Sequence, residues 1–598
     1  MGINSTLFQR LERLLLTPYF ALFLIAAACW AAYFNSLSVP FYLDDVGSIT
    51  NNKFFDNATY VSLFNDYGLR YLGYLGLWWN YEYAKLDVTS YHIVNTSIHM
   101  FTGVAVFFLT RKLTLLLGTF DTLDTPNSRQ LHTAMACFVA LVFVLHPLQS
   151  QGVTYIVQRL ASQVALFYVG SLTFYLYARS ATLLKTQFLF TLLSICFAVA
   201  ACFTKQNAFT LPIIIVLCEW LVFKSISKKV TLVSLAAVVM TLLALFVFQN
   251  SLMPILEKVD TLTRETTDIS RMEYFLAQLP ILWNYIGKVF LPWPLQLEYD
   301  YTVDGFSQWV LIAAAIAHVA VVVCAVLVRE KYPLVTWGVL FYYLTHIVES
   351  GVIPITDIAF EHRNYLPNVG LFIAVGFVAF RAIIKLRGGR TAWFVPSTLF
   401  LALLLIALGT LTVKRNQQWL SPELFLANDM TQAPKQARAI HNYAEFKLKQ
   451  GEVQTALTLL EKLYSLDLKR IDAIMLNTHL AALIDAQQYK QAIQKGEMLL
   501  KQPLQAKARA IINSNMGIVY TNLQQYKKAN TYFERAYGKA SLPANSLIAY
   551  AYTSFVAGNY SRSTALCNQI LSIEPQHRKA RLLLSMIKEK KKGNVANE

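Results

Sequence analysis

The sequence predicts an all-α protein, in which a polytopic bundle of transmembrane helices is followed by a C-terminal α-solenoid. The chain has 598 residues, of which 55% are hydrophobic and only 15% charged, and its mean hydropathy is +0.41. This composition is typical of a polytopic membrane protein with a soluble appendage. Apolar runs long enough to span a bilayer recur as far as residue 412, and from about Ser421 a polar helical repeat replaces them.

About eleven spans are expected within a transmembrane domain at 17–412. Their hydropathy and length satisfy the requirement for a spanning helix. The runs lie near 17–35, 93–110, 133–147, 162–178, 187–203, 208–223, 230–248, 309–328, 333–349, 366–380 and 392–412. Residues 276–292 are more polar, with Gln278 and Lys288, and are predicted to form an interfacial or re-entrant helix.

The distribution of cations predicts the orientation of these spans. Residues 1–16, with Arg10 and Arg13, are placed in the cytoplasm, and every even-numbered span then ends in lysine or arginine. The first apolar run lacks a small-residue cleavage pattern, so it is expected to remain as an anchor. The first outer loop, 36–92, and the C-terminal region then lie outside, which in a bacterial inner membrane is the periplasm.

The C-terminal part is predicted to be a linker helix at 413–436 and a tetratricopeptide repeat domain with a capping helix at 437–598. The period is about 34 residues. The best unit has small and aromatic residues at tetratricopeptide offsets: Gly517, Tyr520, Tyr526, Ala529, Phe533 and Ala536. From residue 421 onward there are 24 lysines and arginines against 13 acids, which gives +11 of the total +17. Such a charge suits an acidic protein partner or anionic lipid headgroups, and no nucleic-acid recognition motif accompanies it.

An acidic pair follows the first span directly. Asp44 and Asp45 lie in PFYLDDVGSITNN, where neighbouring ionised carboxylates repel and require water or a cation. One interpretation is a catalytic carboxylate at the mouth of a membrane-facing cavity. The alternative is a solvated loop that caps a helix beginning near Val46.

Further polar residues gather at the predicted outer boundaries of other spans. Three cations, Arg159, Lys205 and Arg363, are candidates for binding a donor phosphate, although each could instead be a snorkelling anchor. His146 precedes a proline and could equally be a capping or packing residue. The other pocket candidates are His146, Gln149, Tyr155, Gln158, Glu361, His362 and Tyr365.

These residue types together suit one kind of chemistry. A carboxylate can take the proton of an acceptor hydroxyl, and arginine and lysine can stabilise a departing phosphate. A lipid-phosphate donor would keep its tail in the bilayer and its phosphate at the headgroup level. The seven cysteines form no CxxC pair, so neither a disulfide framework nor a metal site is indicated. No cofactor is expected, although a divalent cation is compatible with the acidic pair.

The motifs in their order resemble one family. PFYLDD…NN is followed by YHIVNTSIHM, HPLQSQGVTYIVQR, TKQNAFTLP, FEHRNYLPNVG and a terminal tetratricopeptide array. This order resembles the membrane proteins with tetratricopeptide repeats related to protein O-mannosyltransferases, within the GT-C class of lipid-linked-sugar glycosyltransferases. The resemblance implies an inverting transfer of sugar from a polyprenyl-phosphate sugar to a protein Ser/Thr hydroxyl. It also implies an acidic base in the first outer loop, which either Asp44 or Asp45 fits. Asp45 is slightly favoured, because the helix expected to begin just after it would point it inward. The family pair is Asp-Glu, whereas this chain has Asp-Asp.

Two functional hypotheses from different classes follow. The first is this membrane glycosyltransferase, with the repeats recruiting the acceptor protein. The second is a non-catalytic membrane scaffold whose repeats assemble an envelope or secretion complex. An en bloc O-oligosaccharyltransferase is an alternative within the enzyme class. Charge pairs at the bilayer edge favour an enzyme, because a scaffold does not need them.

Overall fold

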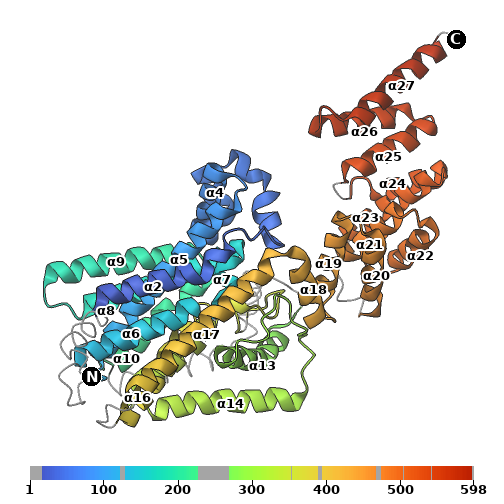
Figure 1. Cartoon of the computed structure of the whole chain (residues 1–598). Coiled ribbons are helices and arrows are strands. Elements are labelled where there is room, and N and C mark those ends of the chain that lie inside the picture. The colour runs from blue at the N-terminus through green and yellow to red at the C-terminus, as the bar shows by residue number, and fades with distance from the viewer. Residues whose placement is uncertain are drawn as a thin grey trace, which may run out of the picture. The chain divides into compact units, whose positions relative to one another are not determined.

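The computed structural model describes residues 17–120, 128–226, 269–351, 353–387, 394–466, 473–502, 504, 506–539 and 542–595. Every regular element in these ranges is helical (Figure 1). The chain divides into two compact units, Met1–Phe425 and Leu426–Glu598. We describe each unit by itself.

The first unit is a helical bundle. Its α-helices are α2 (Pro18–Tyr33), α3 (Tyr60–Tyr67), α4 (Tyr71–Ala84), α5 (Val88–Leu116), α6 (Ser128–Leu145), α7 (Gln151–Thr154), α8 (Arg159–Arg179), α9 (Leu184–Cys202), α10 (Leu211–Leu221), α13 (Arg271–Phe290), α14 (Gln308–Leu327), α15 (Pro333–His346), α16 (Asn368–Arg387) and α17 (Phe394–Leu420). α18 (Pro422–Gln432) begins at the end of this unit. Short helices that matter for the site are η2 (Val46–Thr50), η5 (Pro147–Gln149), η6 (Ile156–Gln158), η7 (Gln206–Thr210) and η8 (Glu361–Asn364).

Seven helices among the described residues are long and apolar enough to cross a membrane, or eight if one bent pair counts as a span. The seven are 18–36, 88–116, 156–179, 184–202, 308–327, 368–385 and 399–420, and each overlaps a predicted run. The fold class, a helical transmembrane bundle with a helical repeat region, is therefore confirmed. The predicted run 208–223 is a shorter apolar helix, 206–221. The run 333–349 is the fourteen-residue α15, and 230–248 lies outside the described residues.

The predicted span at 133–147 is bent by 55° where α6 ends and η5 begins. Pro147 is the first residue of η5 and has no N–H to continue the α6 ladder. The His146 imidazole accepts the N–H of Leu148 through Nδ1 at 3.2 Å, and its Nε2 lies 3.0 Å from the carbonyl oxygen of Val289. His146 therefore makes the contact of a capping residue at the start of η5.

Close helix packing surrounds the apolar core of this unit, which includes Ile25, Val139 and Trp337. α15 and α16 approach closely at Gly338 and Gly370, where a Cβ on either glycine would lie 2.4 Å from the carbonyl oxygen of the other. No larger residue fits there without moving a helix. This packing holds η8, which lies just before α16, in a fixed place.

Two segments begin or end elsewhere than the sequence suggests. The segment expected at 276–292 is α13, a twenty-residue helix outside the candidate spans, and its interfacial placement stays a prediction. α17 continues past residue 412 to Leu420. The extra turns are stabilised because Asn416 donates to the carbonyl oxygen of Ala32 at 3.1 Å and accepts from Thr154 at 2.7 Å.

The second unit is a stack of antiparallel helix pairs (Figure 1). Its helices are α19 (Ala437–Lys449), α20 (Val453–Glu461), α21 (Ala473–Asp485), α22 (Tyr489–Leu500), α23 (Ala506–Asn522), α24 (Tyr526–Ala536), α25 (Ala544–Val556), α26 (Tyr560–Ile573) and α27 (Arg578–Val595). A Cβ on Gly517 would lie 2.7 Å from the ring of Phe533, so α23 and α24 meet where only glycine fits. Phe533 and Ala529 are fully buried there.

Candidate functional site

The two aspartates that follow α2 differ sharply in exposure. Asp44 is exposed, whereas the Asp45 side chain is 1% exposed. Leu43, just before them, has φ of +40°, a conformation that a leucine rarely adopts. The residues after the pair form η2, a π-helix of five residues, which is a rare element often found at functional sites. The local backbone is therefore unusual at the position that the sequence singled out.

Asp45 attaches the segment after α2 to η6, directly before α8. Its Oδ2 accepts the backbone N–H of Tyr42 at 3.0 Å, and its Oδ1 accepts the N–H of Val157 at 2.7 Å. Burial raises the pKa of the Asp45 carboxyl from 3.8 to about 7, although the two backbone N–H groups favour the ionised form. Both carboxylate oxygens are thus engaged with the protein.

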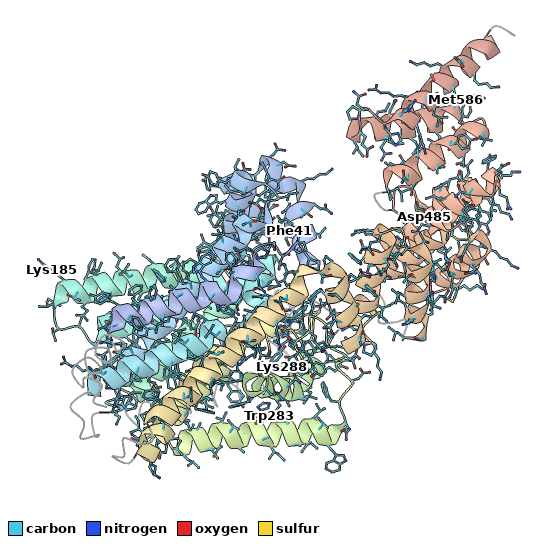
Figure 2. All side chains as sticks on the ribbon, viewed as in Figure 1. Phe41, Lys185, Trp283, Lys288, Asp485 and Met586 are labelled. Atoms are coloured by element: carbon cyan, nitrogen blue, oxygen red, sulfur yellow. The ribbon has the colours of Figure 1, made fainter. Side chains whose placement is uncertain are left out.

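Asp44 contacts Tyr155 with its backbone and also with its side chain. Its N–H donates to the Tyr155 hydroxyl at 2.9 Å. The Tyr155 ring lies 5.6 Å from the Trp419 ring, and Tyr42 donates its hydroxyl to the Trp419 carbonyl oxygen at 2.6 Å. Aromatic side chains therefore form a wall beside an exposed carboxylate. The label of Phe41 in Figure 2 shows where this segment lies.

A second polar group also borders Trp419, near the end of α17. Arg415 is 4% exposed and lies 5.7 Å from the centre of the Trp419 ring. Its Nη1 donates to the Leu295 carbonyl oxygen and to Gln418 Oε1, both at 2.8 Å. Its Nη2 is 3.7 Å from Glu361 Oε2, which is an ion pair but not a hydrogen bond.

Three donors in this second group have no hydrogen-bond partner within the described residues. They are Nε and Nη2 of Arg415 and Nε1 of Trp419, all buried. Glu361 instead accepts at Oε1 from the N–H of Gln296 at 2.7 Å and from the Tyr299 hydroxyl at 2.8 Å. A buried donor without a partner is unfavourable by about 1–3 kcal/mol. Three of them in one place indicate a site for an acceptor such as an anionic oxygen.

Lys205 and Arg363 belong to a third polar group, centred on Glu349. Lys205 Nζ is 2.5 Å from Glu349 Oε1, and Asn207 donates to Glu349 Oε2 at 2.9 Å. Arg363 Nη1 donates to the Tyr274 hydroxyl at 3.0 Å, which in turn donates to the Glu349 carbonyl oxygen at 2.6 Å. Lys205 and Arg363 therefore meet at Glu349, Lys205 through the carboxylate and Arg363 through the main-chain oxygen, and the sequence analysis did not include Glu349.

Arg363 is held almost entirely by main-chain oxygens. Its guanidinium also donates to the carbonyl oxygens of Asp357 and Ile358. The neighbouring His362 donates its backbone N–H to Gln151 Oε1 at 2.7 Å. Burial, followed by the charges of Lys205 and Arg363, lowers the pKa of His362 well below its usual value, so the imidazole is neutral. Glu349 leaves Lys205 partly neutralised, with a side chain that is still 12% exposed.

Arg159 is fully buried and bound to neutral acceptors. It donates to Asn95 Oδ1 at 2.5 Å, to the Gly76 carbonyl oxygen at 2.9 Å and to the Tyr91 carbonyl oxygen at 3.1 Å. All three guanidinium nitrogens are therefore used to join α4, α5 and α8. This arrangement favours a positioning role for Arg159 over direct contact with a phosphate.

The remaining pocket candidates are distributed between the site and the bundle core. Tyr365 places its hydroxyl 2.5 Å from His99 Nδ1, in the apolar core. Gln149 is buried beside it and donates to the Tyr365 carbonyl oxygen at 3.5 Å. Gln158 is half-buried at the end of η6. Among the described residues, no group of three or more metal-ligating side chains was found.

Glu349, Arg415 and Trp419 were not predicted. Glu349 ends the run 333–349 and Arg415 follows the run 392–412, where a single charge is usually a flanking residue. The spacing of Arg415 and Trp419 is i, i+4, which places both on one face of α17. That spacing next to an apolar run is the signal from which the pair could have been found.

Two curated relatives resemble part of the chain. The mouse protein O-mannosyl-transferase TMTC3 is 31% identical over 166 residues, and the fruit-fly protein O-mannosyl-transferase Tmtc3 is 29% identical over 157 residues. The matched segments span 25% and 23% of this chain but only 16% of each relative. The chain is thus a weak homologue of these proteins over a limited segment. No family model and no solved structure matches it.

Proposed function

We propose that the chain is a membrane glycosyltransferase that moves a sugar from a polyprenyl-phosphate donor to a serine or threonine hydroxyl of a protein. Asp44 is the general base. The observation that carries the proposal is an exposed carboxylate beside Tyr155, which packs near Trp419, together with the buried donors of Arg415 and Trp419 that lack hydrogen-bond partners within the described residues. The partial likeness to protein O-mannosyl-transferases supports the same class of reaction.

Asp44 is the better base of the pair. An acceptor hydroxyl must come within hydrogen-bond distance of the base, and the exposed Asp44 side chain is open to it. Asp45 is buried, with both oxygens accepting backbone N–H groups. The sequence slightly favoured Asp45, because a helix beginning just after it would point it inward. It does lie inward, and for that reason we assign it the role of positioning the loop.

The donor phosphate is proposed to bind at Arg415 and Trp419. Their three unpartnered donors would each gain an oxygen acceptor, and a charge-assisted bond from a guanidinium to phosphate is the strongest of these. Lys205 remains a candidate second contact because Nζ carries three donors and forms one ion pair with Glu349. Arg159 and Arg363 are proposed to position these elements, since protein acceptors already hold them.

The reaction follows from this arrangement. The acceptor oxygen forms a bond to the anomeric carbon of the sugar while its proton passes to the Asp44 carboxylate. The bond between that carbon and the phosphate oxygen breaks, and the lipid phosphate leaves with the bonding electron pair. Arg415 stabilises the negative charge that develops on the leaving phosphate. Attack opposite to the leaving group inverts the configuration at the anomeric carbon.

Asp44→Asn tests the proposal, with Asp66→Asn as the matched control. Both residues are exposed aspartates of the first outer loop, and both changes remove one negative charge. In lipid nanodiscs with a set of polyprenyl-phosphate sugars, Asp44→Asn is expected to lower transfer by at least about 100-fold, the lower range for a general base. Asp66→Asn is expected to keep wild-type transfer. Equal activity of the two variants would place the base elsewhere.

A further inference from the structure

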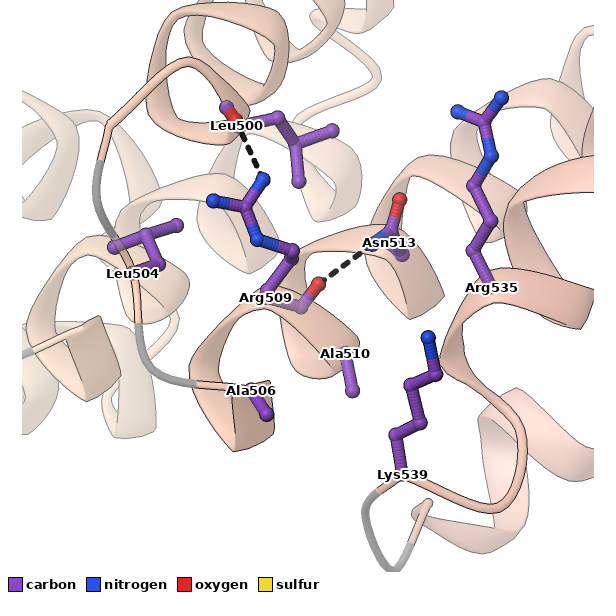
Figure 3. Close-up of a pocket in the computed structure, with 8 residues that line it drawn as sticks. All are labelled: Leu500, Leu504, Ala506, Arg509, Ala510, Asn513, Arg535 and Lys539. Atoms are coloured by element: carbon purple, nitrogen blue, oxygen red, sulfur yellow. Dashed lines mark hydrogen bonds between the residues drawn. The ribbon is translucent and has the colours of Figure 1, made fainter.

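The second unit contains a cavity that the proposed chemistry does not use. Its volume is about 560 Å³, within the range of ligand pockets in proteins. It lies between the end of α22, the start of α23 and the end of α24 (Figure 3). The lining residues are Leu500, Leu504, Ala506, Arg509, Ala510, Asn513, Arg535 and Lys539.

The cavity carries a concentrated positive charge. Three of its eight lining residues are cations and none is an acid. The surrounding stretch 500–540 has seven lysines and arginines (Lys501, Lys507, Arg509, Lys527, Lys528, Arg535 and Lys539) and a single acid, Glu534. Its net charge of +6 is more than half of the +11 of the whole C-terminal part. Three of these seven cations, Arg509, Arg535 and Lys539, line the cavity.

The cations of the cavity have different partners. Arg509 donates to the carbonyl oxygens of Leu500 at 2.7 Å and Gln502 at 2.9 Å, so it fixes the connection between α22 and α23. Arg535 lies in the last turn of α24 and Lys539 just beyond its end, and neither has an ion pair with a carboxylate among the residues described. Arg535 lies 5.5 Å from the centre of the Tyr532 ring. Figure 3 shows both on the side of the cavity opposite Leu504.

We infer that this cavity binds an acidic segment of a protein, in which glutamates or aspartates alternate with apolar residues. The carboxylates would pair with Arg535 and Lys539, and the apolar side chains would pack on Leu500, Leu504 and Ala510. A recessed cavity with leucine walls suits a peptide better than a flat membrane surface, because lipid headgroups are contacted across a plane. That the bound protein is the glycosyl acceptor rests on the proposed function; the binding itself does not.

Binding is measured with the full-length protein in neutral phosphatidylcholine nanodiscs and no sugar donor. The probe is a short fluorescein-labelled peptide rich in glutamate with interspersed leucines, and the same peptide with glutamine in place of glutamate is the control. We expect the glutamate peptide to bind, and to bind more weakly as salt rises. The glutamine peptide lacks the carboxylates that pair with Arg535 and Lys539, so it is expected to bind at least about tenfold more weakly, which corresponds to about 1.4 kcal/mol.

A matched pair of charge reversals separates the cavity from the general charge of the domain. Arg535→Glu with Lys539→Glu should weaken peptide binding by at least about tenfold. Lys527→Glu with Lys528→Glu changes the net charge equally, at the start of α24 and outside the cavity, and should change binding by less than about twofold.

Three results would overturn the inference. The first is an equal loss of peptide binding in both double variants. The second is wild-type binding in the Arg535 and Lys539 variant. The third is a wild-type protein that does not bind the peptide but binds phosphatidylglycerol vesicles, with this vesicle binding lost in the Arg535 and Lys539 variant. Because no donor is present, a failure of glycosyl transfer would leave these measurements unaffected.

Discussion

Asp45→Asn is predicted to loosen the first outer loop from the start of α8. The Asp45 carboxylate accepts two backbone N–H groups, those of Tyr42 and Val157, while buried from solvent. An asparagine side chain has one oxygen and one NH₂ group, so it can accept at only one of these positions. The other N–H is left buried, facing a second donor.

The magnitude follows from that lost bond. Leaving one buried donor without a partner is unfavourable by about 1–3 kcal/mol. If local opening of the loop exposes the Val157 amide, its hydrogen exchange should become roughly 5- to 150-fold faster, because 1.36 kcal/mol corresponds to tenfold. Hydrogen–deuterium exchange with mass spectrometry on peptides covering 150–160 measures the change.

Asp44→Asn is the matched control for this experiment. It alters the adjacent residue but leaves its backbone N–H bond to Tyr155 in place. We expect exchange at Val157 to stay at the wild-type rate in Asp44→Asn, even though transfer is lost. Unchanged exchange in Asp45→Asn, or equal acceleration in both variants, would refute the assignment of separate roles to the two aspartates.

Three further predictions follow from the structure. Arg415→Ala should weaken binding of the polyprenyl-phosphate donor by about 1.5–3 kcal/mol, measured by titration in nanodiscs, and unchanged affinity would exclude it from the phosphate site. The pKa of Asp45 in the folded protein, about 7, lies above its ordinary value of 3.8. The stability that Asp45 contributes is therefore fully present below about pH 4 and is lost as the pH rises through about 7. The melting temperature should fall over this pH range in wild type and not in Asp45→Asn. Phe533→Ala should destabilise the second unit by about 3–5 kcal/mol because Phe533 is fully buried against Gly517, and a wild-type melting temperature would contradict that packing.

The sequence was sufficient for the fold class because hydropathy and helix period are local properties of a chain. Seven predicted runs coincide with membrane-length helices. The end of α17 could not be predicted in the same way, since Asn416 extends the helix through partners on α2 and α7. Such contacts join residues more than 250 positions apart and leave no local signal.

The same reason limited the prediction of the site. Residue type and position near the bilayer singled out Asp44, Asp45, Arg159, Lys205 and Arg363, which the structure divides among separate polar groups. The difference between the two aspartates depends on which of them is buried, and that follows from the Val157 amide, 112 positions away. The partners of Arg159 are likewise set by distant helices, so a cation that looked available for phosphate is bound to carbonyl and amide oxygens.

The central claim is that this chain transfers a sugar to a protein hydroxyl, and intact mass spectrometry of an acceptor tests it most directly. Purified wild-type protein in nanodiscs would be incubated with individual polyprenyl-phosphate sugars and a serine- and threonine-rich acceptor domain. The account predicts a mass increase of one sugar residue, attached with inverted anomeric configuration and absent in Asp44→Asn. Addition of a whole oligosaccharide, or undiminished transfer by Asp44→Asn, would contradict it.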